Sequence, residues 1–147
     1  MNMTVEPETG FVGAACFTEP VKLECRGGKM LAGNWTDFGA LNFYSGGVIY
    51  RKEIRMPEEV SRMKTVLDLG GVNATCEVRI NNRPVDVLMQ SPYRLDISDW
   101  LVTGNNLLEV LVYSTLSNHY QTIPSAYRGK PVLGLLGPVK VQSYKAE

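Results

Sequence analysis

The chain has 147 residues with 15 basic and 15 acidic side chains and one histidine, so its formal net charge is zero. This length fits a single domain and excludes a TIM barrel, which needs about 250 residues. The balanced charge argues against nucleic acid as a partner, because phosphate binding needs an excess of Lys and Arg. No apolar stretch approaches the roughly 20 residues that span a bilayer, so we expect no membrane partner either.

The N-terminal segment carries the least patterning of the chain. We predict that residues 1–16 form a tether or irregular lead-in and that residues 17–147 form one β-sandwich domain. The start MNMTVEPETG has neither a basic region nor an apolar run, so no signal peptide is visible. The compartment stays open, with a periplasmic or secreted parent protein as one interpretation.

Three cysteines, Cys16, Cys25 and Cys76, form an odd and widely spaced set without a C-x-x-C motif. A Cys16–Cys25 disulfide and three free thiols both fit this spacing. We favour buried free thiols, because Cys76 alternates with apolar residues in the manner of a core position.

From Val48 onward, apolar and polar residues alternate in short segments. Such a period of two indicates strands with one face in a core and the other toward solvent. In the first of them Val48 and Tyr50 share one face, and Arg51 lies on the other. The strands are expected within residues 48–56, 63–69, 74–80, 85–89, 107–113 and 139–141.

Turn signals separate these segments. Asn81 and Asn82 can both adopt positive φ and should close a hairpin, and Gly104 with its neighbours predicts a second turn. Residues 58–62 and 98–102 are each suited to one helical turn, the latter with Ser98 as N-cap. Eight or nine strands at this spacing predict an all-β sandwich or barrel.

One long segment, residues 114–131 (STLSNHYQTIPSAYRGKP), interrupts the strand pattern. A stretch of this length without strand patterning is unusual inside a compact domain and is usually functional or disordered. It holds the only histidine, two tyrosines and Arg128, a mixture that suits a sugar surface.

Several stretches in a fixed order resemble the sugar-binding jelly-roll domain of family 2 glycoside hydrolases. The similarity is greater still to the accessory domain of large bacterial α-L-rhamnosidase-like hydrolases, and it covers about residues 20–142. The stretches are WTDFGALNFYSGGVIY (35–50), CEVRINN (76–82), SPYRLDIS (91–98), GNNLLEV (104–110) and GLLGPV (134–139).

The resemblance implies a galactose-binding-like β-sandwich, or jelly roll, of two antiparallel sheets. It also implies a module of a larger glycoside hydrolase, with carbohydrate and the catalytic domain of the parent chain as partners. Most of the shared stretches are scaffold, and fold alone does not give function. Residues 134–138, for example, are expected to let two backbones approach closely.

No catalytic, metal or cofactor site stands out. A glycosidase needs two carboxyl groups flanking the scissile bond, but Glu53, Asp68, Glu77 and Glu109 fall on polar strand faces outside any acid/base motif. A Ser/His/Asp triad would have to use His119, but the sequence has no Gly-x-Ser-x-Gly motif to present a nucleophilic serine. Structural Ca²⁺ is common in galactose-binding-like modules, but no clustered acidic loop is present here. We therefore expect no catalytic residue, metal or cofactor.

Sugar binding needs an aromatic face for the apolar side of a pyranose and planar polar groups for its hydroxyls. Trp35 and Tyr44 are weaker candidates, for which core or rim packing is the alternative, and Trp100 is expected to plug the core. The function expected is a non-catalytic accessory domain that binds glycan or shapes substrate access. The alternatives are a purely structural spacer and, more distantly, a free-standing lectin-like protein. The main site candidates lie in the long segment: Asn118, His119, Tyr120, Gln121, Tyr127 and Arg128.

Overall fold

The computed structural model describes residues 32–39, 41, 44–117 and 131–145. They belong to one compact unit, Ala32–Glu147, and the chain's other unit, Met1–Leu31, lies outside the described residues. The predicted lead-in and the thiols of Cys16 and Cys25 therefore lie outside them too. Within the described part, no helix is long and apolar enough to cross a membrane.

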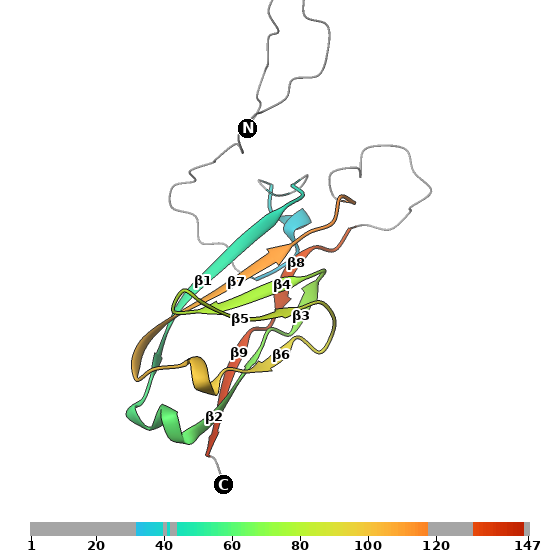
Figure 1. Cartoon of the computed structure of the whole chain (residues 1–147). Helices are drawn as coiled ribbons and strands as arrows, with labels where there is room; N and C mark the ends of the chain where they lie inside the picture. Colours follow the sequence, from blue (N-terminus) through green and yellow to red (C-terminus); the bar gives the residue numbers. More distant parts are fainter. Residues whose placement is uncertain (1–31, 40, 42–43, 118–130, 146–147) are drawn as a thin grey trace, which may run out of the picture. The chain divides into compact units, whose positions relative to one another are not determined.

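The described residues form nine strands and three short 3₁₀ helices (Figure 1). The elements in chain order are η1 (Trp35–Asp37), β1 (Gly47–Met56), η2 (Glu58–Arg62), β2 (Met63–Asp68), β3 (Gly71–Asn73), β4 (Cys76–Ile80), β5 (Arg83–Leu88), β6 (Arg94–Asp96), η3 (Ser98–Trp100), β7 (Gly104–Tyr113), β8 (Gly134–Gly137) and β9 (Lys140–Lys145).

The strands pair antiparallel in three hydrogen-bonded groups. One sheet has the order β1-β7-β4-β5, a second has the order β6-β2-β9, and β3 pairs with β8. The predicted all-β antiparallel sandwich of eight or nine strands is confirmed, although the hydrogen bonds divide into three groups rather than two. Figure 1 shows β3 and β8 as continuations of β2 and β9.

A close backbone contact explains the division of the second sheet. A Cβ on Gly70 would lie 2.5 Å from the carbonyl carbon and oxygen of Gly137. Both glycines have positive φ, +66° and +71°, so the two backbone segments bend sharply where they touch. The predicted close approach of two backbones at residues 134–138 is confirmed, and it interrupts the ladder between β2–β9 and β3–β8.

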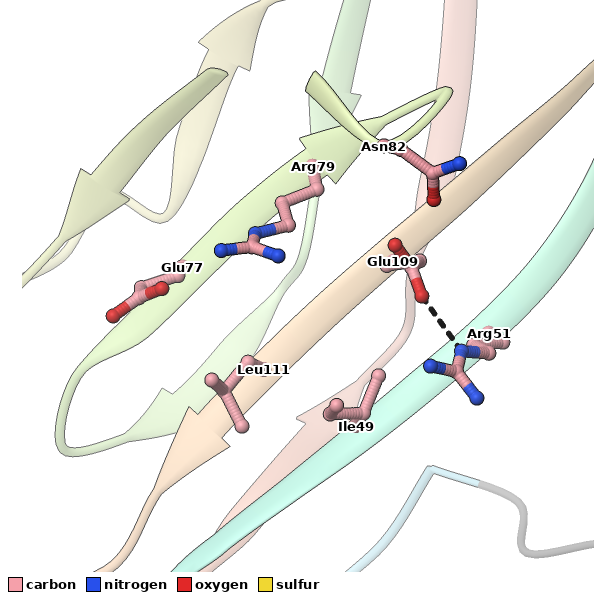
Figure 2. A pocket seen from close by; sticks show the side chains of 7 residues that line it. All are labelled: Ile49, Arg51, Glu77, Arg79, Asn82, Glu109 and Leu111. Atoms are coloured by element: carbon pink, nitrogen blue, oxygen red, sulfur yellow. Dashed lines mark hydrogen bonds and ion pairs between the residues drawn. The ribbon is translucent and has the colours of Figure 1, made fainter. Parts of the chain in front are cut away.

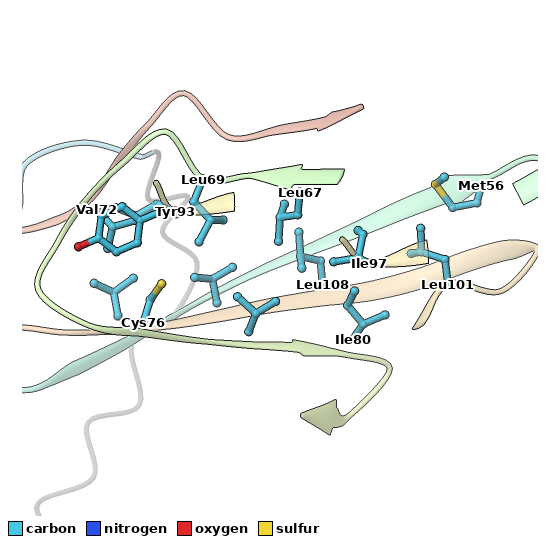
Figure 3. Packing of buried hydrophobic residues seen from close by; sticks show 14 of the residues in the cluster. Met56, Leu67, Leu69, Val72, Cys76, Ile80, Tyr93, Ile97, Leu101 and Leu108 are labelled. Atoms are coloured by element: carbon cyan, nitrogen blue, oxygen red, sulfur yellow. The ribbon is translucent and has the colours of Figure 1, made fainter. Parts of the chain in front are cut away.

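The core lies between the inward faces of the strands. Leu67 and Leu69 from the β2 segment face Cys76 and Ile80 of β4 and Leu108 of β7 (Figure 3). All five are buried, as the period-two pattern predicts. Removing this apolar surface from water is the main favourable term in folding, at about 25 cal/mol per Å².

The predicted turn is confirmed at the β4–β5 hairpin, but the predicted cap at η3 is not. Asn81 and Asn82 have φ of 52° and 64° and close the β4–β5 hairpin as predicted. Ser98, however, is the first residue of η3 and not its N-cap, so that prediction was wrong. Its hydroxyl accepts a hydrogen bond from the Thr65 backbone at 2.8 Å and ties η3 to β2. The Ser98 hydroxyl donates to an Asp96 carboxylate oxygen, and the Ser98 N–H donates to the same oxygen at 3.0 Å; these two hydrogen bonds lower the pKa of Asp96.

Trp35 of η1 is fully buried at one end of the sandwich. Its indole Nε1–H donates to the hydroxyl of Tyr50 on β1 at 2.6 Å. The ring lies directly against the backbone of Gly134, where an added Cβ would come 2.2 Å from Nε1. Trp35 therefore joins η1, β1 and the start of β8 in a single packing unit.

We predict that Gly134→Ala destabilises the domain by about 3–5 kcal/mol, because a methyl group meets the indole and φ is unfavourable. Gly104→Ala is the matched control, since Gly104 also has positive φ, +86°, but its Cβ would meet nothing within 4 Å. That variant should cost only about 1–2 kcal/mol. Urea unfolding of both variants measures the difference, and equal losses would contradict the packing role of Gly134.

Candidate functional site

The long segment between β7 and β8 leaves and returns at the Trp35 end of the sandwich. The main predicted site residues lie on the part of it outside the described residues. The structure describes the two ends of this segment, residues 114–117 and 131–133, which we call the outgoing and returning stems. The predicted residues concerned are Asn118, His119, Tyr120, Gln121, Tyr127 and Arg128.

The outgoing stem is bonded to the segment that enters β1. The Ser114 N–H donates to the Gly46 carbonyl at 2.9 Å, and the Gly46 N–H donates to the Ser114 hydroxyl at 2.9 Å. The Ser45 hydroxyl donates to the Thr115 carbonyl at 3.0 Å. These contacts fix the direction in which the chain leaves β7.

The returning stem is fixed by η1 and its N-cap. The Leu133 N–H donates to the side-chain oxygen of Asn34 at 3.0 Å, and the Leu133 carbonyl accepts from the Trp35 N–H at 3.0 Å. The side-chain amide of Asn73 also donates to the Val132 carbonyl. Both stems are therefore anchored to the rigid part of the sandwich.

The weaker aromatic candidates occupy different environments. Trp35 has no exposed ring face, so the structure gives it the core-packing role left open above. Tyr44 is 37% exposed, its hydroxyl donates to the Gly47 carbonyl at 3.0 Å, and its ring centroid lies 6.1 Å from that of Trp35. Trp100 is only partly buried, and the Arg83 guanidinium lies 5.1 Å from its ring centroid. Of the first two, only Tyr44 exposes part of a ring beside the stems.

A second feature lies on the outer face of the β1-β7-β4-β5 sheet. A hollow of about 230 Å³ opens there between side chains of β1, β7 and β4 and the β4–β5 turn (Figure 2). We call it the sheet hollow. Its lining residues are Ile49, Arg51, Glu77, Arg79, Asn82, Glu109 and Leu111.

The centre of the sheet hollow is a row of charges across three strands. The strand register pairs Glu109 with Arg51 on one side and with Arg79 on the other. The Arg51 Nε lies 2.6 Å from a Glu109 carboxylate oxygen, and the Glu109 side chain is only 10% exposed. Within the described part of the chain, Arg79 makes no hydrogen bond or ion pair with a neighbour. Figure 2 shows the Glu109 carboxylate between the two arginines.

The lining also contains a second carboxylate, that of Glu77, so its two arginines and two glutamates balance in charge. The Tyr113 hydroxyl donates to Glu77 at 2.8 Å, and this bond raises the pKa of Tyr113. Ile49 and Leu111 supply the apolar part of the lining. The sequence analysis placed Glu77 and Glu109 on polar strand faces but missed the hollow, because the cross-strand register was needed to bring their partners alongside.

The described residues offer little for metal or thiol chemistry. Among them no group of three His, Cys, Asp or Glu side chains comes together to hold a metal ion. Cys76 is a free, buried thiol, and burial raises its pKa to about 11, so it stays protonated and unreactive at neutral pH. The favoured interpretation of Cys76 as a buried free thiol is confirmed.

An antiparallel β-sandwich with a long insertion at one end defines the chain as a galactose-binding-like module. A family model described as "Glycosyl hydrolase 2 galactose-binding domain-like" matches residues 43–131, more than half of the chain. The chain therefore belongs to this family, and the resemblance inferred from the sequence is confirmed.

The relatives are much longer proteins, of which this chain spans only a small part. The chain is 36% identical over 80 residues to a "Putative beta-glucuronidase" of Formosa agariphila, covering 53% of this chain and 7% of that protein. It superposes on a rhamnosidase from Novosphingobium sp. PP1Y with a TM-score of 0.65 and 27% identity, covering 76% of this chain and 12% of the other. A family 2 member from Bacteroides cellulosilyticus DSM 14838 shares the fold, with a TM-score of 0.60 and 18% identity over 78% of this chain and 16% of that one.

We predict that Arg51→Gln destabilises the domain by about 1–2 kcal/mol at neutral pH, because it leaves a largely buried Glu109 carboxylate without its ion pair. The value is below that of a fully buried pair, since the Arg51 side chain is 64% exposed. Arg55→Gln, on the same strand face and exposed, should change stability by less than about 0.5 kcal/mol. Equal midpoints for the two variants in urea would show that the pair contributes nothing.

Proposed function

We propose that this domain is a non-catalytic accessory module of a glycoside hydrolase, in which the segment 114–131 binds glycan or shapes substrate access. Family membership supports the class of the parent protein. The observation that carries the site is the anchoring of both stems, Ser114–Thr115 on one side and Val132–Leu133 on the other, to the β1 entry, η1 and Asn73. The two ends of this segment are therefore fixed to the sandwich.

The chemistry of the presented segment favours carbohydrate. Tyr120 and Tyr127 offer aromatic faces for the C–H side of a pyranose, and Asn118, His119 and Arg128 offer planar hydrogen-bonding groups. Gln121 adds another amide. Tyr44, which is partly exposed and precedes Ser45 at the outgoing stem, offers a further aromatic ring.

The parent chain supplies the proposed partners. The relatives are named as a β-glucuronidase and a rhamnosidase, so we propose a parent enzyme that acts on a glycoside. This chain spans 7% and 12% of those two proteins, which leaves room in such a parent for a catalytic domain against which the module packs.

A structural spacer without a sugar site is the second candidate. Exposed apolar side chains along the returning stem and the β8–β9 strands favour it, because such groups gain by packing against another domain. These side chains are Val132, Leu136 and Val139.

The test is a ligand-observed NMR titration of the purified chain with rhamnose, galactose, glucuronate and a few oligosaccharides, with and without Ca²⁺. We expect saturable binding with a dissociation constant of about 1 mM, or roughly 4 kcal/mol. Tyr120→Ala and Arg128→Ala should abolish it. Tyr144→Ala and Arg55→Ala, which change exposed residues away from the stems, should leave it intact.

Three outcomes would contradict parts of this proposal. Silence up to tens of millimolar would favour the structural spacer. Binding that survives both loop substitutions would remove the site from the long segment. Release of nitrophenol from nitrophenyl glycosides by the purified chain, in proportion to its concentration, would show that the module is catalytic.

A further inference from the structure

Strand β1 forms one edge of the β1-β7-β4-β5 sheet, and the proposed function makes no use of that edge. Among the described residues β1 pairs only with β7, and Figure 1 shows it as the outermost strand of this sheet. It has ten residues, whereas strands are commonly about five or six residues long. A long edge of this kind presents a row of backbone N–H and C=O groups with which another strand can pair.

The backbone groups of alternate β1 residues point away from β7. Glu53 lies opposite Leu107, and the Leu107 carbonyl accepts from the Asn81 N–H at 2.9 Å, on the far side of β7. The backbone groups of Glu53 and of every second residue of β1 therefore face outward. At the start of the strand, the Gly47 carbonyl is already taken by the Tyr44 hydroxyl at 3.0 Å. The residues whose backbone groups remain available are Ile49, Arg51, Glu53 and Arg55.

Lys52 interrupts the apolar face of β1 at its centre. It lies on the face of the strand that packs against the core, yet it is exposed, and its register partner Leu108 is buried. Among the residues that the structure describes, Lys52 makes no ion pair. A charge on the core side of an edge strand opposes pairing with a further strand, because pairing would remove it from water. The apolar residues on the same face are Val48, Tyr50, Ile54 and Met56.

Apart from Lys52, the β1 edge is complementary to itself. In an antiparallel pair of β1 strands related by a two-fold axis at Lys52, Arg51 lies opposite Glu53 of the second copy, and Glu53 lies opposite Arg51. Opposite charges in directly facing positions stabilise a strand pair. The outward backbone groups of both residues also match in this register, so each facing pair can exchange two hydrogen bonds. The same register sets apolar residues opposite each other, Tyr50 against Ile54 and Val48 against Met56.

The one unfavourable pair in this register is Lys52 with itself. The backbone of Lys52 points toward β7, so the two lysines would form a non-hydrogen-bonded pair, in which facing Cα atoms are only about 4.5 Å apart. Like charges in this position destabilise the strand pair. We propose that β1 is a strand-addition edge that fits the β1 strand of a second copy, and that Lys52 keeps this edge closed in the native chain.

The first test removes the charge. Lys52→Val should strengthen self-association of the purified chain at least about tenfold over the native chain, because a β-branched apolar pair replaces the facing lysines. Lys64→Val is the matched control, since Lys64 is also an exposed lysine on a strand but lies on β2, between β6 and β9. It should leave self-association unchanged. Sedimentation equilibrium over a range of concentrations measures both, and a thermal melt by circular dichroism establishes that both variants are folded.

The second test reverses the charge. Lys52→Glu alone should stay monomeric, because two glutamates then face each other. A mixture of Lys52→Glu with the native chain should form a heterodimer, at least about tenfold more tightly than either chain pairs with itself, because Lys52 then faces a carboxylate. With only the native chain isotope-labelled, its amide NMR shifts should be centred on residues 49–55.

The outcomes separate clearly. A heterodimer in the mixture and a dimer of Lys52→Val, both with shifts on β1, support the proposal. Monomeric Lys52→Val together with a mixture that does not associate would overturn it, as would association whose shifts lie away from β1. A native chain that already pairs through β1 would show that Lys52 does not close the edge.

Discussion

The contact between Trp35 and Gly134 is the constraint on which the functional end of this domain depends. An indole can lie against the backbone of β8 only where no side chain projects, and the hydrogen bond to Tyr50 orients the ring from the opposite strand. The same tryptophan also fixes the returning stem, because its backbone N–H donates to the Leu133 carbonyl. A single buried residue therefore holds β1, β8 and the stem together.

This arrangement separates the structural role of the domain from its proposed binding role. The core and the Gly70–Gly137 contact hold the strands in register and need no ligand. The two stems of the long segment are bonded to that base, and connecting segments generally tolerate changes better than the core does. Family membership classifies the sandwich as a galactose-binding-like domain. We propose that the specificity for a ligand lies in the long segment.

The sequence predicted what depends on local pattern. Alternation gave the inward residues of β2, β4 and β7, and paired asparagines gave the β4–β5 turn, because both signals act within a few residues. It failed at Ser98, whose hydroxyl bonds to a strand 33 positions away, and at the sheet hollow, which exists only once β1, β7 and β4 are in register. The sequence leaves Trp35 open as a sugar-binding platform or a core residue. Its packing against Gly134, which is distant in sequence, decides for the core.

The most direct test of the central claim is an amide-resolved NMR titration of the domain with neutral sugars, rhamnose and galactose first. Residue-specific shifts show where a ligand contacts the chain, whatever its affinity in the millimolar range. The account predicts saturable shifts for Gly46, Ser114–Ser117 and Val132–Gly134, at the anchored stems. Shifts confined to the opposite end, around Gly104 and η2, or no shifts at tens of millimolar sugar, would contradict it.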